Sequence, residues 1–285
     1  MKKHLLKTLF LCLFALVGTT AFAYDCEVDG IYYNLNTTNQ TASVTYLSDF
    51  NRGRVYSGVV HIPEKVVYDG ITYSVTSIGD QAFYGCSSLT AVTIPNSITT
   101  IGITAFGACS RLTELAIPNS VTSIGDSAFS GCSGLTELTI PNSVITIGFY
   151  AFYDCRRLTE LTIPNSVTSI GEYAFENCYN LISVTSLNTT PPTTDYYTFD
   201  YNTHYRYATL HVPAGCKKAY AQAEGWKNFL NILEDAVDGI APVVAGQQAK
   251  PAAIYTIDGV KQNATSLRDL PGGIYIVNGK KVVIK

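Results

Sequence analysis

The sequence predicts a solenoid of stacked, β-rich repeats with a β-rich cap, a helical cap and a small C-terminal β module. The first observation is a period of 23 residues, seen in residues 91–113 (AVTIPNSITTIGITAFGACSRLT), 114–136 (ELAIPNSVTSIGDSAFSGCSGLT) and 137–159 (ELTIPNSVITIGFYAFYDCRRLT). The second is that the positions that stay constant are mostly apolar. Since one unit buries too little apolar surface to offset its conformational entropy, we expect each repeat to be stabilised by its neighbours.

Residues 1–23 are predicted to be a secretory signal peptide. Lys2, Lys3 and Lys7 precede an apolar run, and residues 21–23 form a small-residue cleavage site. A retained membrane helix is the less favoured alternative, because the run is short and a cleavage site follows it. We therefore expect the protein to be secreted or held at the outer cell surface.

The mature chain would have 262 residues and an acidic balance. Three of the 19 basic residues lie in the signal peptide, which leaves 16 basic against 22 acidic side chains, a formal charge of −6. This excludes the basic footprint of a nucleic-acid-binding protein. We expect no transmembrane segment after signal removal, because no further apolar stretch is long enough.

Residues 24–75 are predicted to be an N-terminal β-rich cap. Short β-rich runs (DGIYYNL, TASVTYL, SGVVHIP, DGITYSV) are separated by Asp-Gly and Asn-rich turns. These runs match no repeat until Ile78 and Gly79. A solenoid needs such a cover, because its terminal repeat otherwise exposes the apolar core.

The solenoid itself is predicted over residues 76–213. Apolar positions alternate in the last four residues of Leu158–Ile163, as in a half-buried strand. Pro164 ends that strand, because proline offers no N–H to a β-ladder. The Ile-Gly pair that follows is expected to turn a corner, with Gly171 and its equivalents at a positive φ.

The segment after the Ile-Gly pair is predicted to be a short helical or 3₁₀ turn. In the repeat containing EYAFENC, Ala174, Phe175 and Cys178 fall at i, i+1 and i+4. The phenylalanine and cysteine recur in every repeat, so equivalent side chains should lie above one another. The two predicted structural ladders are Phe83, Phe106, Phe129, Phe152 and Phe175, and Cys86, Cys109, Cys132, Cys155 and Cys178.

The cysteine ladder is predicted to consist of buried free thiols. Stacked at the strand spacing of about 4.8 Å with parallel side chains, the residues would not converge as disulfides require. Zinc needs ligands that converge on one point, so a metal site is a weaker alternative. Cys26 and Cys216 lie near opposite ends, too far apart to pair with each other.

One complete repeat fits the pattern L-x-x-(L/V)-x-I-P-x-x-(V/I)-x-x-I-G-x-x-A-F-x-x-C. Its positions are filled by Leu112, Leu115, Ile117, Pro118, Val121, Ile124, Gly125, Ala128, Phe129 and Cys132. Over residues 71–187 this resembles the BspA-like leucine-rich repeats of surface proteins from oral and gut bacteria. The resemblance implies a right-handed leucine-rich-repeat solenoid with a parallel β-sheet on one side. It also implies adhesion to host extracellular proteins or to other cells.

The C-terminal region is predicted to contain three parts. Residues 214–234 form a helical cap whose Tyr220, Trp226 and Phe229 cover the last repeat, and residues 235–250 form a linker. Residues 251–285 form a β segment that resembles type IX secretion sorting tails. This likeness is carried by Tyr255, Gly259, Gly273, Tyr275 and Lys285. A small β module without a sorting role is the alternative.

The sequence predicts no catalytic, cofactor-binding or metal-binding site. His204 and His211 lie near Asp195 and Asp200, but no catalytic or metal-ligating motif frames them. No phosphate-binding or dinucleotide-binding motif is present. Outward-facing glutamates recur in three successive repeats and are interpreted as a solvated sheet face, with a cation-binding row as the alternative: Glu114, Glu137 and Glu160.

The candidate partner-binding surface is where variable positions become aromatic or basic. Tyrosine and arginine often anchor protein recognition, and here they replace the Ser, Gly and Thr of earlier repeats. The residues are Phe149, Tyr150, Tyr153, Arg156, Arg157, Tyr173 and Tyr179. By the period, Tyr150 should lie over Tyr173, and Arg156 beside Tyr179. Ordinary exposure is the alternative, since the chain has 20 tyrosines.

These observations predict a non-catalytic, exported binding or adhesion protein. Its partners would be host extracellular proteins or bacterial surface proteins. The alternative is a carbohydrate-binding or structural accessory of the cell surface, in which the aromatic side chains stack on the sugar rings of glycans.

Overall fold

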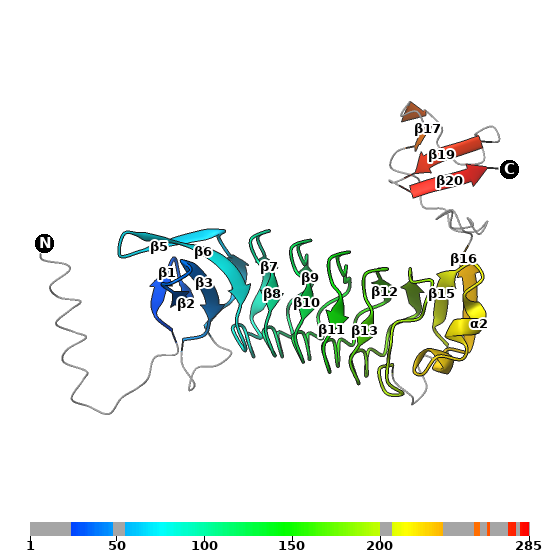
Figure 1. Ribbon diagram of the computed structural model, residues 1–285, viewed down its shortest axis with the longest axis horizontal. Helices are drawn as coiled ribbons and strands as arrows, with labels where there is room; N and C mark the ends of the chain where they lie inside the picture. Colours follow the sequence, from blue (N-terminus) through cyan, green and yellow to red (C-terminus); the bar gives the residue numbers. More distant parts are fainter. Residues whose placement is uncertain are drawn as a thin grey trace, which may run out of the picture.

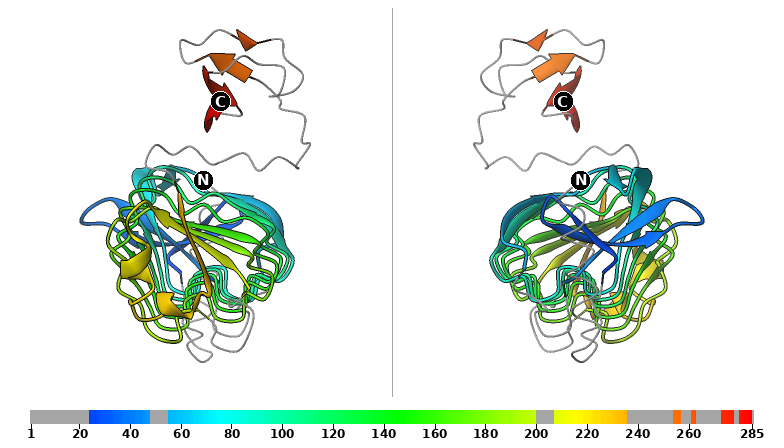
Figure 2. Two further views of the ribbon diagram at one scale, coloured as in Figure 1. Left: turned by 90° about the vertical axis from the view of Figure 1, so that its right-hand side faces the viewer. Right: turned by 90° about the vertical axis from the view of Figure 1, so that its left-hand side faces the viewer.

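The computed structural model describes residues 24–47, 55–199 and 207–235, together with the backbone of four strands between residues 254 and 284. The predicted signal peptide lies outside these residues, as does the linker beyond Asp235. Between residues 55 and 235, the described chain winds into rungs stacked along one axis (Figure 1). Viewed along that axis, successive rungs superimpose (Figure 2). The predicted leucine-rich-repeat solenoid is confirmed.

Each rung has two strand-forming sides and one side made of turns. The first wall is a sheet with strand order β1-β2-β3-β6-β8-β10-β11-β13, with β5 paired to β6. Its strands are β1 (Cys26–Val28), β2 (Ile31–Asn36), β3 (Thr41–Thr45), β5 (Lys65–Tyr68), β6 (Ile71–Ile78), β8 (Thr100–Ile101), β10 (Ser123–Ile124), β11 (Thr146–Ile147) and β13 (Ser169–Ile170).

The second wall consists of two parallel sheets joined by single bridges. The strand orders are β4-β7-β9 and β12-β14-β15-β16, and bridges from Ala116 to Thr139 and from Thr139 to Thr162 connect them. These strands are β4 (Gly58–His61), β7 (Leu89–Thr93), β9 (Glu114–Leu115), β12 (Glu160–Ile163), β14 (Ser183–Ser186), β15 (Thr209–Pro213) and β16 (Asn231–Asp235).

The register of both walls repeats the 23-residue period. Ser123 pairs with Thr146, and Ile124 with Ile147. Glu160 pairs with Ser183 in the opposite wall. Since partners lie one period apart, every apolar position falls directly above its equivalent in the next rung. The buried core therefore runs the length of the stack.

The third side is a series of turns, not the short helical or 3₁₀ turn that was predicted. Alternate amides donate to the next rung, as Phe83 does to the carbonyl of Ala105 (2.7 Å). The intervening amides donate back three residues, as Tyr84 does to Gln81 (3.0 Å). Two residues per rung have a positive φ, and this alternation prevents a helix: Gln81, Gly85, Thr104, Ala108, Ser127, Gly131, Tyr150, Asp154, Tyr173 and Asn177.

The glycine of the Ile-Gly pair is required for a reason other than the predicted positive φ. In the described residues the left-handed glycines are at other positions, Gly85 and Gly131 among them. A Cβ on Gly125 would lie 2.8 Å from the carbonyl carbon of Gly102, and one on Gly171 would lie 2.5 Å from the backbone nitrogen of Phe149. Glycine recurs because the backbones of adjacent rungs approach each other closely at this corner.

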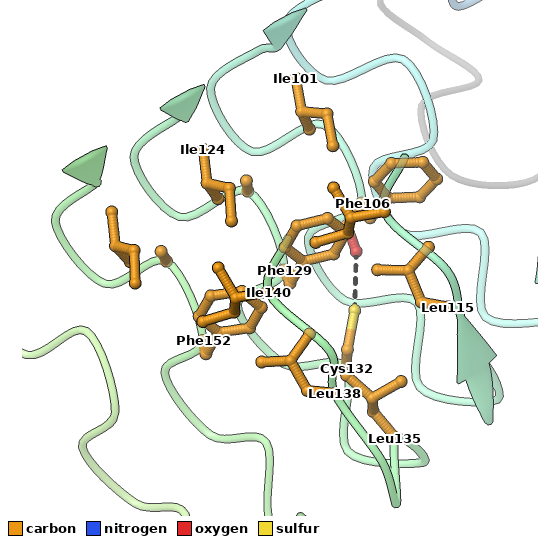
Figure 3. Close-up of a cluster of buried hydrophobic side chains, with 14 of the residues drawn as sticks. Ile101, Phe106, Leu115, Ile124, Phe129, Cys132, Leu135, Leu138, Ile140 and Phe152 are labelled. Atoms are coloured by element: carbon orange, nitrogen blue, oxygen red, sulfur yellow. Dashed lines mark hydrogen bonds between the residues drawn. The ribbon is translucent and has the colours of Figure 1, made fainter. Parts of the chain in front are cut away.

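The phenylalanine ladder forms a continuous stack of buried rings (Figure 3). Centroid separations from Phe83 through Phe106, Phe129 and Phe152 to Phe175 are 4.8, 5.2, 5.2 and 5.4 Å, with interplanar angles of 9° or less. All five side chains are fully buried. The aromatic column continues into both ends of the solenoid, since Tyr56 packs on the first ring and Phe199 on the last.

The ladder cysteines are buried and unbridged in the structure. Four of them donate a sulfur hydrogen bond to a phenylalanine carbonyl, as Cys132 Sγ does to the carbonyl of Phe106 at 3.2 Å (Figure 3). The equivalent donors are Cys109, Cys155 and Cys178. These four thiols thus fill the core and donate to carbonyls that also accept a backbone amide.

The first rung begins inside the segment predicted to be the N-terminal cap. Strand β4 pairs in parallel with β7, which aligns VVHIP (residues 59–63) with AVTIP (residues 91–95). Ile78 pairs with Ile101 in the other wall. The offset is 32 residues in the first case and 23 in the second, because the β5–β6 hairpin adds nine residues within the rung. The residues that cover the rung are those of β1–β3.

The C-terminal end is closed by side chains from the predicted helical cap. Helix α2 (Lys217–Tyr220), the 3₁₀ turn η2 (Trp226–Asn228) and the residue after it supply three buried aromatic side chains. Trp226 and Phe229 pack on Phe199, and Tyr220 packs on Trp226. The indole N–H of Trp226 donates to the carbonyl of Pro192 (2.9 Å). This end also contains a strand, because β16 extends the sheet in parallel with β15.

The four C-terminal strands form an antiparallel sheet in the order β18-β17-β19-β20. They are β17 (Ile254–Thr256), β18 (Lys261–Gln262), β19 (Gly273–Val277) and β20 (Lys280–Ile284). A β segment was predicted here, and its proposed sorting role stays a prediction.

The close approach of rungs predicts that Gly125→Ala destabilises the protein. The added methyl group meets backbone atoms of Gly102 at 2.8 Å, and relieving such a clash costs about 1–3 kcal/mol. Thr122→Ala, an exposed position of the same rung, is the control. Guanidinium unfolding of both variants measures the effect, and equal midpoints would contradict the steric explanation.

The seven cysteines of the mature chain are expected to be inert until the protein unfolds. Burial raises the pKa of Cys132 to about 12, so the reactive thiolate is scarce in the folded state. Without reductant, a colourimetric thiol reagent should modify seven thiols in denaturant and almost none in native buffer. Fewer reactive thiols in denaturant would indicate bridging and contradict this prediction.

Candidate protein-binding surface

The central feature of the candidate surface is a row of tyrosines along the turn side. The first positive-φ position of each rung is polar in the early rungs, where it is Gln81, Thr104 or Ser127. In the next two rungs this position carries tyrosine, Tyr197 follows in the rung after them, and the rings stack from rung to rung. We call Tyr150, Tyr173 and Tyr197 the tyrosine row.

The rings of the tyrosine row are in direct contact. Tyr150 and Tyr173 stack with centroids 4.7 Å apart and 9° between planes, and Tyr173 and Tyr197 stack at 5.1 Å and 19°. Phe149 packs edge-on against both Tyr150 (4.4 Å) and Tyr173 (5.7 Å). Tyr153 meets Tyr150 edge-on at 5.1 Å. Four of the predicted residues are therefore brought together, as the period indicated for Tyr150 and Tyr173.

The backbone holds two of these tyrosines in an unfavourable conformation. Tyr150 has a φ of 54° and Tyr173 a φ of 58°. This left-handed region suits Gly, Asn and Asp and is disfavoured for bulky side chains. The fold imposes the conformation on every rung, but the choice of tyrosine at two successive rungs has a conformational cost. Such outliers are commonly associated with function.

Phe149 is positioned by a carboxylate from the preceding rung. Its backbone N–H donates to Asp126 Oδ1 at 2.8 Å. The same bond links the N–H of Ile103 to Asp80 at 2.7 Å. Phe149 remains 38% exposed, so its ring is held at the surface beside the tyrosine row.

Two glutamates give the surface a negative character. Partial desolvation raises the pKa of Tyr150, and the charges of Glu176 and Glu172 raise it further. For Tyr173, desolvation followed by a hydrogen bond and charge from Glu172 raises the pKa to about 12. The phenols are therefore neutral donors at physiological pH, beside carboxylates that can accept hydrogen bonds.

The remaining predicted residues lie at the next corner of the rungs. Arg156 Nε donates to Asp154 Oδ1 (2.7 Å), and Tyr179 donates to Asn177 Oδ1 (2.6 Å). The charge of Arg156 is thus paired within its own rung. Arg157 is exposed, and within the described chain no hydrogen bond or ring contact joins it to the tyrosine row.

Tyr197 belongs to the surface, although the sequence left open whether the Tyr-rich segment 196–207 extends this surface or fills a cap. Here the period lengthens by one residue: Ser169 bridges to Thr193, and Phe175 stacks on Phe199. A search at 23 residues therefore pairs Tyr173 with Tyr196 and Phe175 with Thr198, one residue out of register. Alignment on the Tyr-x-Phe triplet, which also occurs at residues 150–152 and 173–175, provides the missing signal.

His211 and Asp195, two of the residues considered for chemistry, have separate hydrogen-bond partners in the structure. His211 Nδ1 lies 3.0 Å from Asp235 Oδ1 on the neighbouring strand, while Asp195 Oδ1 accepts from the amide of Tyr197. His204 and Asp200 lie outside the described residues.

The three outward-facing glutamates lie on the second wall, away from the tyrosine row. Glu114, Glu137 and Glu160 are exposed there. Among the residues that the structure describes, no three His, Cys, Asp or Glu side chains are grouped so as to bind a metal ion. No helix in the same residues is long and apolar enough to cross a bilayer.

The fold and the repeated turn side define a leucine-rich-repeat protein. The BspA type leucine-rich repeat region matches residues 70–182 in six copies. Residues 70–182 of the solenoid are therefore leucine-rich repeats of the BspA type.

Solved structures with related folds are bacterial leucine-rich repeat proteins. A leucine-rich repeat protein of T. pallidum is 25% identical with a TM-score of 0.51, and the match covers 74% of this chain and 83% of that protein. One from Bacteroides ovatus is 31% identical with a TM-score of 0.53, and the match covers 68% of this chain. The chain spans 57% of the length of that protein. No curated protein sequence matches the chain.

The environment of Tyr173 predicts how its phenol titrates. Since the folded pKa is about 12 and the unfolded value about 10, the folded state gains stability below pH 10. That gain is lost as the pH rises through about 12. Glu172→Gln should lower the pKa of Tyr173. Glu160→Gln should not, because Glu160 lies on the second wall and Tyr173 on the turn side. Tyrosine ring NMR measures both, and an unshifted pKa in the first variant would contradict the assignment.

Proposed function

We propose that the protein is a non-catalytic, exported surface protein that binds a protein partner through the tyrosine row. The observation that carries this proposal is the stack of three tyrosine rings, of which Tyr150 and Tyr173 are held at positive φ. Tyrosine combines a large apolar surface with a hydrogen-bonding hydroxyl, and it is common at the centre of protein interfaces. The presence of BspA-type leucine-rich repeats supports a binding role.

The rigidity of the row supports a recognition role energetically. Ring contacts between rungs and the bond from Asp126 to the Phe149 amide restrict the side chains before a partner arrives. Binding then loses less side-chain entropy than it would at a mobile surface. The glutamates beside the row favour a partner with complementary basic or hydrogen-bond-donating groups.

The carbohydrate alternative fits the tyrosine row less well. Sugars pack on open aromatic faces, but Tyr173 is sandwiched between Tyr150 and Tyr197. Phe149 packs against the same group. The row therefore offers ring edges and hydroxyl groups, which suit a protein surface better than a pyranose ring.

Export and display at the cell surface complete the proposal. The predicted signal peptide supports export, and the likeness of the C-terminal segment to sorting tails supports transfer to the surface. Adhesion to host extracellular proteins or to neighbouring bacteria is the role we infer for such a displayed solenoid.

Truncating two tyrosines of the row should weaken partner binding. We expect Tyr150→Ala with Tyr173→Ala to weaken binding at least tenfold, about 1.4 kcal/mol. Immobilised mature protein would be exposed to solubilised extracellular matrix and bacterial surface extracts. Captured proteins would be identified by mass spectrometry, purified and measured by surface plasmon resonance.

Tyr68→Ala is the control, because Tyr68 is a surface tyrosine (38% exposed) on the β5–β6 hairpin, outside the tyrosine row. Circular dichroism would establish that each variant is folded. If the double variant keeps full affinity for every captured protein, the proposed function is wrong.

A further inference from the structure

A separate hollow lies on the turn side, towards the N-terminal end from the tyrosine row. It has a volume of about 290 Å³. Its floor is formed by two successive rungs and its ends by tyrosines of the rungs before and after them. The lining residues are Tyr84, Thr104, Gly107, Ala108, Ser127, Ser130, Gly131, Tyr153 and Asp154.

The hollow exists because one repeat position changes size. Tyr84, Gly107, Ser130 and Tyr153 are equivalent, each 23 residues from the next. The two small residues leave space between the two tyrosines, whose backbones lie three rung spacings apart, or roughly 14 Å. A Cβ on Gly107 would lie 3.0 Å from the Tyr84 ring, so glycine at this position allows the ring at this end of the hollow to approach the neighbouring rung closely.

The lining offers the side-chain hydroxyl groups of Thr104, Ser127 and Ser130. In the described part of the chain, no hydrogen bond engages the side chains of Thr104, Ser127 or Ser130. The carboxylate of Asp154 is paired with Arg156 at 2.7 Å. The lining is therefore polar without a net charge, which suits a neutral ligand rich in hydroxyl groups.

The tyrosines at the ends of the hollow differ from those of the tyrosine row. Tyr84 is 40% exposed, and among the described residues no aromatic ring stacks on it. On the side of Tyr153 that faces the hollow, the equivalent residue of the neighbouring rung is the small Ser130. Tyr153 contacts Tyr150 edge-on. Aromatic surface is thus open towards the hollow, where an apolar face of a ligand can pack.

We propose that this hollow binds one neutral pyranose unit of a glycan. The volume lies at the lower end of the about 300–1,000 Å³ typical of ligand sites, which suits a single sugar ring. The hydroxyls of the floor would pair with sugar hydroxyls, and the tyrosines would pack on C–H faces. This second site adjoins the tyrosine row, since Tyr153 contacts Tyr150, but it includes none of the three residues of the row.

Filling the hollow tests the proposal without disturbing the fold. Ser130→Tyr places a ring in the middle of the floor, at a repeat position that already carries tyrosine in Tyr84 and Tyr153. Tyr84→Ala removes one aromatic end. Thr139→Tyr adds the same ring to an exposed position of the second wall and is the matched control.

The mature protein would be applied to an array of neutral, sialylated and sulfated oligosaccharides. The best neutral oligosaccharide would then be titrated by calorimetry. We expect binding to neutral glycans that falls at least tenfold in Ser130→Tyr and in Tyr84→Ala and is unchanged in Thr139→Tyr. Circular dichroism would establish that all three variants are folded.

Absence of binding to every neutral oligosaccharide would overturn the proposal, as would binding restricted to acidic glycans. Neutral-glycan binding that survives in Ser130→Tyr would also overturn it. Because these variants leave Tyr150, Tyr173 and Tyr197 intact, protein capture should persist in them. Failure of the glycan site is therefore distinguishable from failure of the proposed protein-binding function.

Discussion

Direct stacking of one rung on the next, at about 5 Å, is the constraint on which the rest of the structure depends. The phenylalanine rings stack at 4.8–5.4 Å along the repeats, and the turn-side amides bond to carbonyls of the following rung. These contacts leave no space for a side chain where adjacent backbones meet at Gly102, Gly125, Gly148 and Gly171. A core organised in this way is a column that would expose apolar side chains at its two ends, so both ends need a cover. Aromatic residues provide it: Tyr56 at one end, and Trp226 and Phe229 at the other.

The same constraint makes the turn side a suitable place for recognition. Its backbone is nearly identical in every rung, because each turn bonds to its neighbours on both sides. Outward side chains can therefore change from rung to rung without altering the scaffold. Small residues leave a hollow over two rungs, and tyrosines form a stacked row over the next three. Two surfaces of different chemistry are thus built from the same repeat positions.

Much of the candidate surface could be predicted, because equivalence in the sequence becomes adjacency in a regular stack. Tyr150 and Tyr173 illustrate this: they are 23 residues apart and stack at 4.7 Å. The period did not place Tyr197 in this stack, because one additional residue makes its offset from Tyr173 24 residues. The first rung was not recognised for the same reason. Its β5–β6 hairpin inserts nine residues between Val66 and Thr76, so the two halves of the rung have different offsets from the next rung. Insertions are invisible to a fixed period, although the stack accommodates them at a corner.

The sequence by itself determined the repeat unit, the inward columns and the order of the rungs, because a 23-residue period of apolar positions has few ways to bury itself. Only the tertiary structure decided how the turn side is built and why its residues are chosen. The recurring glycine is needed for a contact between rungs, and the left-handed conformations fall on other residues such as Tyr150 and Tyr173. Periodicity identifies which residues are equivalent, but the conformation of each turn depends on hydrogen bonds made to the neighbouring rungs.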